Sequence, residues 1–154
     1  MREERIDYNT LRDDFSIYEV ENGQILKVKL SIVDVVNKID GDNAKKGSVG
    51  TNPYSHVITP SDIERYDVKY EQGVASDKDH VKELKFTTVS EIINIYETKK
   101  LFIFSGIRVE KIFLTNKVDS ANNPRLRYES VSVIDAIEKP NFDNPPNNVQ
   151  NNPK

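Results

Sequence analysis

Two alternating apolar runs flank an Asn-Gly pair near the start of the chain. Asp14-Phe15-Ser16-Ile17-Tyr18-Glu19-Val20-Glu21 precedes Asn22-Gly23, and Gln24-Ile25-Leu26-Lys27-Val28-Lys29-Leu30 follows it. Alternation of apolar and polar residues is typical of a half-buried strand. Because Asn and Gly both accept the positive φ of a type I′ turn, this segment predicts a β-hairpin with that turn.

A related pattern recurs in the second half of the chain, at an offset of 78 in the numbering. Ile6-Asp7-Tyr8-Asn9-Thr10-Leu11 and Ser16-Ile17-Tyr18-Glu19 correspond in order and spacing to Leu84-Lys85-Phe86-Thr87-Thr88-Val89 and Asn94-Ile95-Tyr96-Glu97. Farther on the offset becomes 79, since Asn37-Lys38-Ile39-Asp40 corresponds to Asn116-Lys117-Val118-Asp119. Two strand-rich segments share such residues by chance as well. We favour an internal duplication, because short words recur in the same order with nearly constant spacing.

A counterpart hairpin without the glycine is expected in the second half, with Lys99-Lys100 at its tip and arms at Ile92–Thr98 and Leu101–Thr115. The second arm of each hairpin changes the parity of its apolar residues partway along. Leu26, Val28, Leu30 and Ile32 precede Val33 and Val35 on the other parity, and Leu101, Ile103, Ile107 and Val109 precede Ile112 and Leu114. Alternation decides which face of a strand is buried, so each change predicts a bulge, a bend or a move of the strand from one sheet to another. At an offset of 79, Leu30 corresponds to Val109 and Val33 to Ile112, and both long strands are expected to bend at the same place.

The expected fold is all-β and mainly antiparallel. It is a pseudo-twofold β-barrel or β-sandwich built from two sequence-related halves, with at most one or two short helical turns. Further strands are expected at Arg5–Leu11, Ser55–Thr59, Tyr66–Tyr70, Glu83–Val89 and Leu126–Ile134, and one helical turn within Thr59–Arg65. Two separate small domains are the alternative, but small cores are marginal and one shared core is favoured.

We expect residues 1–138 to form a single β domain with repeats at about 5–70 and 83–138 and a linker at 71–82. Residues 139–154 hold four of the seven prolines and six asparagines, which is typical of a disordered tail. No apolar run approaches the ~20 residues of a membrane span, and no secretory signal follows Met1. A soluble, cytoplasmic protein without a membrane partner is expected.

The composition argues against several chemistries. The 154 residues include no cysteine and two histidines, which excludes disulfides and thiol nucleophiles and disfavours a zinc centre. The six glycines never take the spacing of a phosphate-binding loop. With 22 basic and 25 acidic residues and a net charge of −3, the surface as a whole offers no electrostatic reason to bind nucleic acid.

Two acidic features could carry chemistry. The Asp40–Asn43 and Asp119–Asn123 loops are rich in oxygen ligands, but neither completes a calcium-loop pattern, and turns select the same residues. Whether they bind a cation stays open. Glu19 and Glu97 correspond by the repeat, so a twofold arrangement could pair two carboxylates as an acid and a base. Surface glutamates beside a hairpin are the commoner case.

Histidines and aromatics give weaker signals. His56 and His80 have no serine or acid at a catalytic spacing, so a structural or solvent-facing role is expected for both. Proteins that bind single-stranded nucleic acid stack the bases on aromatic side chains that lie beside basic residues. The aromatic candidates are Tyr8, Tyr18, Phe86, Tyr96, Phe102, Phe104 and Tyr128. The same alternation describes any half-buried strand.

We predict no catalytic, cofactor-binding or metal-binding residue, and no cofactor. The sequence favours a noncatalytic binding or assembly module that recognises another protein, or a second copy of itself, through β edges or hairpin tips. A duplicated β framework with long apolar strands needs its edges covered, which motivates this prediction. The alternative is a β-barrel that binds a small molecule or single-stranded nucleic acid, and an enzyme is less favoured than either.

Overall fold

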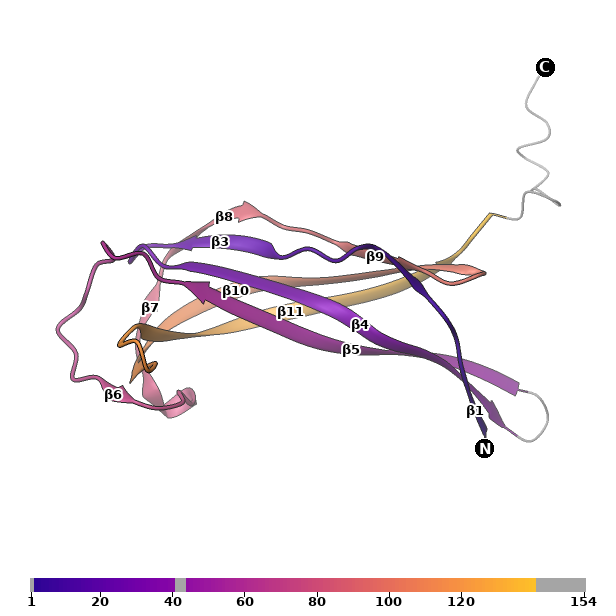
Figure 1. Cartoon of the computed structure of the whole chain (residues 1–154), viewed down its shortest axis with the longest axis horizontal. Coiled ribbons are helices and arrows are strands. Elements are labelled where there is room, and N and C mark those ends of the chain that lie inside the picture. The colour runs from indigo at the N-terminus through magenta and orange to yellow at the C-terminus, as the bar shows by residue number, and fades with distance from the viewer. Residues whose placement is uncertain (1, 41–43, 141–154) are drawn as a thin grey trace, which may run out of the picture.

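The computed structural model describes residues 2–40 and 44–140 of the chain, and these form two sheets of mainly antiparallel strands (Figure 1). The sheets lie face to face in a sandwich-like arrangement, so the predicted all-β fold is confirmed. Within the described ranges, the helical content is a single 3-10 turn at Asp77–Asp79.

The first sheet, here the β4 sheet, is built around β4 (Ile25–Asp40). Strand β5 (Ala44–Ile58) pairs with β4 along its whole length. The other edge of β4 is shared by β3 (Ser16–Val20) at one end and β1 (Arg2–Arg5) at the other. Strand β8 (Phe86–Ser90), from the second half of the chain, completes the sheet by pairing with β3.

The second sheet, here the β10 sheet, repeats this arrangement around β10 (Leu101–Val118). Strand β11 (Pro124–Glu138) pairs along β10, whose other edge is shared by β9 (Asn94–Glu97) and β7 (His80–Leu84). Strand β2 (Asn9–Arg12), from the first half of the chain, pairs with β9. A short parallel strand, β6 (Glu71–Gln72), adds to the end of β10.

Apart from the β6–β10 pairing, the strand pairings of the two halves therefore correspond one to one. Strands β1 to β5 hold the places in the first half that β7 to β11 hold in the second. In addition, β2 and β8 are exchanged, since each pairs in the sheet built by the other half. Each sheet thus depends on a strand from the opposite half of the chain.

The predicted hairpin at Asn22-Gly23 forms, but its turn type differs from the prediction. The Gly23 N–H donates to the Val20 carbonyl at 2.8 Å and the Val20 N–H donates to the Gln24 carbonyl at 2.9 Å. Only Gly23 of the pair has a positive φ, +97°. A turn with glycine alone in the left-handed region fits a three-residue loop rather than type I′, which needs positive φ at both central residues.

Each long strand has a bulge where the parity of its apolar residues changes, as the sequence predicts. The β4–β5 ladder skips Val33, and the β10–β11 ladder skips Glu110. The offset between the two bulges is thus 77, so the expected correspondence of Val33 with Ile112 is wrong. The β9–β10 turn is shorter than the β3–β4 turn, which shifts the offset from 78 to 77. Val33 itself is half exposed at the bulge.

Several predicted strand bounds are wrong. The expected Arg5–Leu11 strand is divided between β1 and β2, and the expected Glu83–Val89 strand is divided between β7 and β8 at Lys85. Strands β5 and β11 extend well beyond Ser55–Thr59 and Leu126–Ile134, because pairing with β4 and β10 holds polar and glycine-containing segments extended.

The connection between the halves also differs from the prediction. The segment Tyr66–Tyr70 forms no strand, and Thr59–Arg65 contains a turn at Ser61–Asp62 in place of a helical turn. Part of the predicted linker 71–82 is ordered as β6, the 3-10 turn and the start of β7. We call residues 59–72 the connector.

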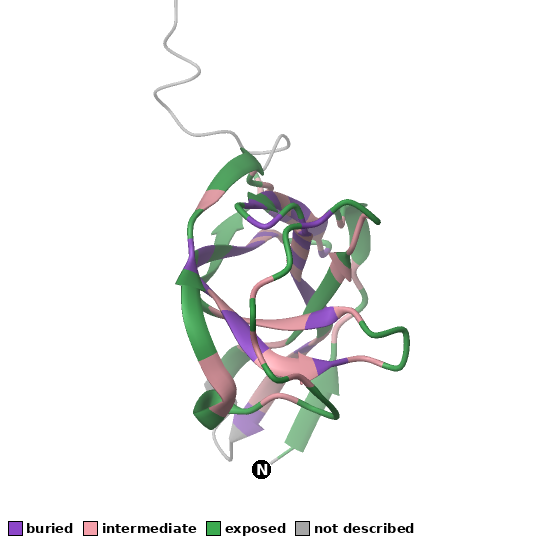
Figure 2. Cartoon of the chain, turned by 90° about the vertical axis from the view of Figure 1, so that its left-hand side faces the viewer, coloured by how far each residue is buried: buried purple, intermediate pink, exposed green. Residues whose placement is uncertain are grey.

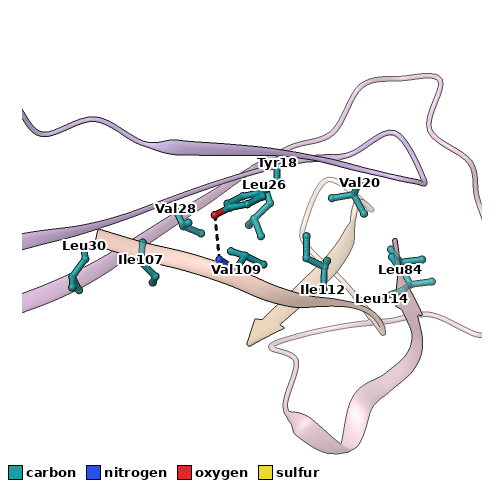
Figure 3. Close-up of a cluster of buried hydrophobic side chains, with 10 residues drawn as sticks. All are labelled: Tyr18, Val20, Leu26, Val28, Leu30, Leu84, Ile107, Val109, Ile112 and Leu114. Atoms are coloured by element: carbon teal, nitrogen blue, oxygen red, sulfur yellow. Dashed lines mark hydrogen bonds between the residues drawn. The ribbon is translucent and has the colours of Figure 1, made fainter. Parts of the chain in front are cut away.

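Buried side chains gather in two clusters between the sheets. Buried residues are coloured purple along the strands in Figure 2, and Figure 3 draws the side chains of the larger cluster. The larger cluster contains Tyr18, Val20, Leu26, Val28, Leu30, Leu84, Ile107, Val109, Ile112 and Leu114. The smaller cluster contains Ile32, Val35, Tyr96 and Ile103. Both draw side chains from both halves of the chain, so the burial of apolar surface that stabilises one sheet also stabilises the other.

The predicted tail, 139–154, lies outside the described residues from position 141 onward. At its start, the Lys139 N–H donates to the Lys100 carbonyl at 2.8 Å, and the Lys139 ammonium pairs with Glu97 at 2.9 Å. These contacts hold the end of β11 against the β9–β10 turn. In the part of the chain that the structure describes, no helix has the length and apolar character needed to cross a membrane.

Candidate interaction surface

Two buried tyrosines at corresponding positions join the halves of the chain. The Tyr18 hydroxyl donates to the Glu91 carboxylate at 2.9 Å. It also accepts from the Val109 N–H at 3.2 Å (Figure 3). The Tyr96 hydroxyl donates to the Asp13 carboxylate at 2.6 Å. Asp13 and Glu91 are offset by 78 in the numbering, as the two tyrosines are, so the same interaction is made twice, each time between halves.

Neighbouring contacts repeat in the same way. Phe86 packs edge-on against Tyr18 with ring centroids 5.6 Å apart, and Tyr8 packs edge-on against Tyr96 at 6.0 Å. Tyr18 and Tyr96 are 0% and 1% exposed to solvent. These two rings are therefore part of the core and are not free to stack on bases.

The pKa values of Tyr18 and Asp13 are shifted in opposite directions. Burial raises the pKa of Tyr18 to about 12, and the neighbouring Glu91 contributes to this rise. Burial alone would raise the pKa of Asp13, but hydrogen bonds from Lys29, Ser31 and Tyr96 outweigh it, and the pKa lies below its usual value of 3.8. Both shifts support a structural role.

We predict that stability falls as the pH rises from 10 to about 12, in part because of Tyr18. In the unfolded chain the Tyr18 hydroxyl loses its proton near pH 10, whereas in the folded chain it keeps the proton until about pH 12. The contribution of Tyr18 to the free energy of unfolding is therefore complete below pH 10 and is lost between pH 10 and about 12. Urea denaturation at both ends of the interval should show a smaller loss for Tyr18→Phe than for the unmodified protein. Tyr54→Phe, at a half-exposed ring, is the control, and an equal loss in Tyr18→Phe would contradict the prediction.

The structure does not bring Glu19 and Glu97 together as a pair. Glu19 is exposed on β3 in the β4 sheet, and Glu97 lies on β9 in the β10 sheet, where it pairs with Lys139. His80 opens β7, and its ring stacks on Phe113 with centroids 4.2 Å apart. His56 is exposed on β5.

His56 and Asp119 line one surface depression of about 480 Å³ together with Arg125. The polar groups of Asp119 and Arg125 are already used locally. Oδ1 of Asp119 accepts from the N–H groups of Asn123 and Ala121, both at 2.9 Å, and these bonds lower the pKa of the carboxyl. The Arg125 Nε donates to the Gly73 carbonyl at 2.6 Å. The depression is thus lined by a turn that Asp119 caps and by an arginine whose side chain is fixed by a backbone carbonyl.

Of the two oxygen-rich loops, the structure describes one in full. Asp119 caps its own loop, and residues 41–43 of the Asp40–Asn43 loop lie outside the described residues. Among the described residues, no group of three histidine or acidic side chains is placed to hold a metal ion.

Strand β11 has an edge that is open along most of its length in the described structure. Near its start, Arg125 and Arg127 donate to the carbonyls of Gly73 and Ala75, so residues 73–77 cover this part. From Glu129 to Glu138 every residue is exposed, and within the described ranges the strand is hydrogen-bonded to β10 alone. We call Glu129–Glu138 the open edge.

The open edge is apolar on both faces. Val131, Val133, Ile134 and Ile137 are 40%, 55%, 45% and 48% exposed. The segment contains no proline, glycine, lysine or arginine. The other long edge strand, β5, contains Lys46, Gly47, Gly50 and Pro53, which are residues that discourage strand pairing. The open edge therefore lacks the protection that β5 has.

Sequence reasoning predicts strands in this region but not the open edge, since pairing on one side only depends on the order of strands in the sheet. The Tyr18–Glu91 and Tyr96–Asp13 pairs are also absent from the prediction, although the offset of 78 relates the carboxylates as well as the tyrosines. Comparisons with family models, curated proteins and solved structures find no match to this chain.

Proposed function

We propose that this protein is a noncatalytic assembly module that pairs with a second copy of itself through the open edge of β11. The observation that carries the proposal is the row of ten consecutive exposed residues, Glu129–Glu138, on a strand that pairs on one side only in the described structure. Outward-facing N–H and C=O groups of such an edge are ready to pair with another strand.

The open edge is complementary to itself. In an antiparallel pairing about a twofold axis at Ile134, Val131 would lie opposite Ile137 and Ser132 opposite Ala136. Asp135 would lie opposite Val133, so its charge would not meet the same charge on the partner strand. This register places Val131 against Ile137 and the Ile134 side chains of the two copies against each other.

The expected affinity is modest. Burying an exposed aliphatic side chain fully contributes about 1.5–3 kcal/mol, but the four side chains here are already about half buried. Association costs on the order of 4–15 kcal/mol in lost translational and rotational freedom. We therefore expect a dimer that dissociates on dilution.

Light scattering over a concentration series tests the proposal. The unmodified protein should change from monomer to dimer as its concentration rises, and Ile134→Lys should remain monomeric because the lysines of the two copies would lie opposite each other on the twofold axis. Tyr54→Lys on β5, a half-exposed position, is the matched control and should still dimerise. A monomer at every concentration, or dimerisation of Ile134→Lys, would contradict the proposal.

Two further expectations belong with this proposal. The matched pairings of β1–β5 and β7–β11 support an internal duplication as the origin of the two halves. Within the described residues, the long strands β5 and β11 each pair on one side only, which supports assembly over a ligand-binding barrel, because a closed barrel has no edges. A cytoplasmic location stays a prediction from the sequence.

A further inference from the structure

A groove of about 1140 Å³ opens at the end of the sandwich that carries the β9–β10 turn. Ile6, Val35, Val49, Leu101 and Ala136 give it an apolar floor, and Glu4, Lys100 and Lys139 lie among the polar residues that line it. Ile6, Val35, Val49 and Leu101 belong to the smaller buried cluster or pack against it. The groove is therefore the exposed side of that cluster.

The opposite end of the sandwich is built from the same elements. Val35 pairs with Val49 in the β4 sheet, and Ile112 pairs with Tyr128 and Leu84 in the β10 sheet. Val35 therefore corresponds to Ile112, Val49 to Tyr128 and Ile6 to Leu84. The Ile6 N–H accordingly donates to the Val35 carbonyl at 2.8 Å. At that end these side chains are part of the larger cluster or pack against it.

The connector covers this corresponding surface. Tyr66 and Val68 pack on the larger cluster, and Ile63 is 8% exposed and lies against Gly23 at the tip of the β3–β4 hairpin. The Glu64 N–H donates to the Asn22 carbonyl at 2.7 Å, and Lys82 lies 4.7 Å above the Tyr66 ring. Lys82 corresponds to Glu4 of the groove. One end of the sandwich is thus closed by the segment that follows β5.

The segment that follows β11 has the same place in the sequence, relative to its hairpin, as the connector that follows β5. Ile58 pairs with Ile25 and Ile137 pairs with Phe102, so the ends of β5 and β11 correspond at an offset of 79. At this offset Phe142 corresponds to Ile63. Lys139 and Pro140 line the groove, so the chain leaves β11 at its rim. The segment 141–154 reaches up to about 46 Å when extended, which is enough to cross it.

We propose that the groove is the docking site of residues 141–154 of the same chain, with Phe142 as the apolar anchor. Gly47 of the groove corresponds to Leu126 of the covered end, and this smaller residue leaves room for an aromatic ring. Attachment of the segment at the rim gives it a high effective concentration, which favours it over a free peptide. This inference does not rest on pairing through the open edge.

Disulfide trapping tests the docking, because the chain has no cysteine of its own. The test variant combines Ser48→Cys in the groove with Asp143→Cys beside the anchor. The control combines Asp143→Cys with Ser120→Cys, an exposed position in the Asp119–Asn123 loop. Under dilute oxidising conditions, the intramolecular disulfide of the test variant should form at least ~10-fold faster than that of the control.

A third variant adds Phe142→Ser to the test pair, and its rate should fall to that of the control. Equal rates in the test and control pairs would overturn the proposal. A rate unaffected by Phe142→Ser would overturn the assignment of the anchor. A disulfide between two chains, seen as a doubled mass, would show that the segment of a second copy occupies the groove and would overturn docking within one chain.

Discussion

Replacing Tyr18 with alanine is expected to lower the free energy of unfolding by about 3–5 kcal/mol, the range for truncating a buried aromatic side chain. The ring is 0% exposed, packs against Phe86 from the other half of the chain, and accepts a hydrogen bond from the Val109 N–H through its hydroxyl. Its loss leaves a cavity in the larger cluster and an unpaired N–H and carboxylate. Urea denaturation followed by circular dichroism measures the change.

Two controls separate packing from hydrogen bonding. Tyr18→Phe keeps the ring and should cost about 1–2 kcal/mol, because it removes only the hydroxyl from its two partners. Tyr54→Ala, at a half-exposed ring, should change stability by no more than ~0.5–1 kcal/mol. If Tyr18→Ala cost no more than Tyr54→Ala, the larger cluster would not be the core of the fold.

The sequence predicts the local elements better than their connections. Alternation around Asn22-Gly23 predicts the first hairpin, and the changes of parity after Ile32 and Val109 predict the bulges, because both signals are contained in a few neighbouring residues. The exact offset between the bulges depends on the length of the β9–β10 turn. That turn lacks a glycine signal, so the sequence does not predict that the offset between the halves changes to 77.

The exchange of β2 and β8 between the sheets is beyond sequence reasoning. Nothing in Asn9–Arg12 distinguishes β9 from β3 as its partner, because the corresponding strands of the two halves have related patterns. The choice is made by tertiary contacts such as Tyr96–Asp13 and Tyr18–Glu91. The open edge of β11 follows from that same sheet order. A candidate surface made of unpaired backbone is invisible to a search for chemical motifs.

Replacing Ile112 with alanine is expected to cost about 2–5 kcal/mol and to weaken both sheets together. Ile112 lies on β10 and is 0% exposed within the larger cluster, where it shares the core with Leu26 and Val28 of the β4 sheet. Since β2 and β8 also bind each sheet to the opposite half, neither sheet can open without loss to the other. Unfolding should therefore be one cooperative transition.

Native-state hydrogen exchange measures this coupling. The slowest amides of β3 and β4 should lose as much protection in Ile112→Ala as those of β9 and β10, because global unfolding exposes all of them. Ile58→Ala on β5, a position 41% exposed, is the matched control and should change protection little in either sheet. Loss confined to β9, β10 and their neighbours would mean that the two sheets unfold separately. In that case the exchanged strands would not couple the halves, and a core shared between them would no longer explain the stability of the fold.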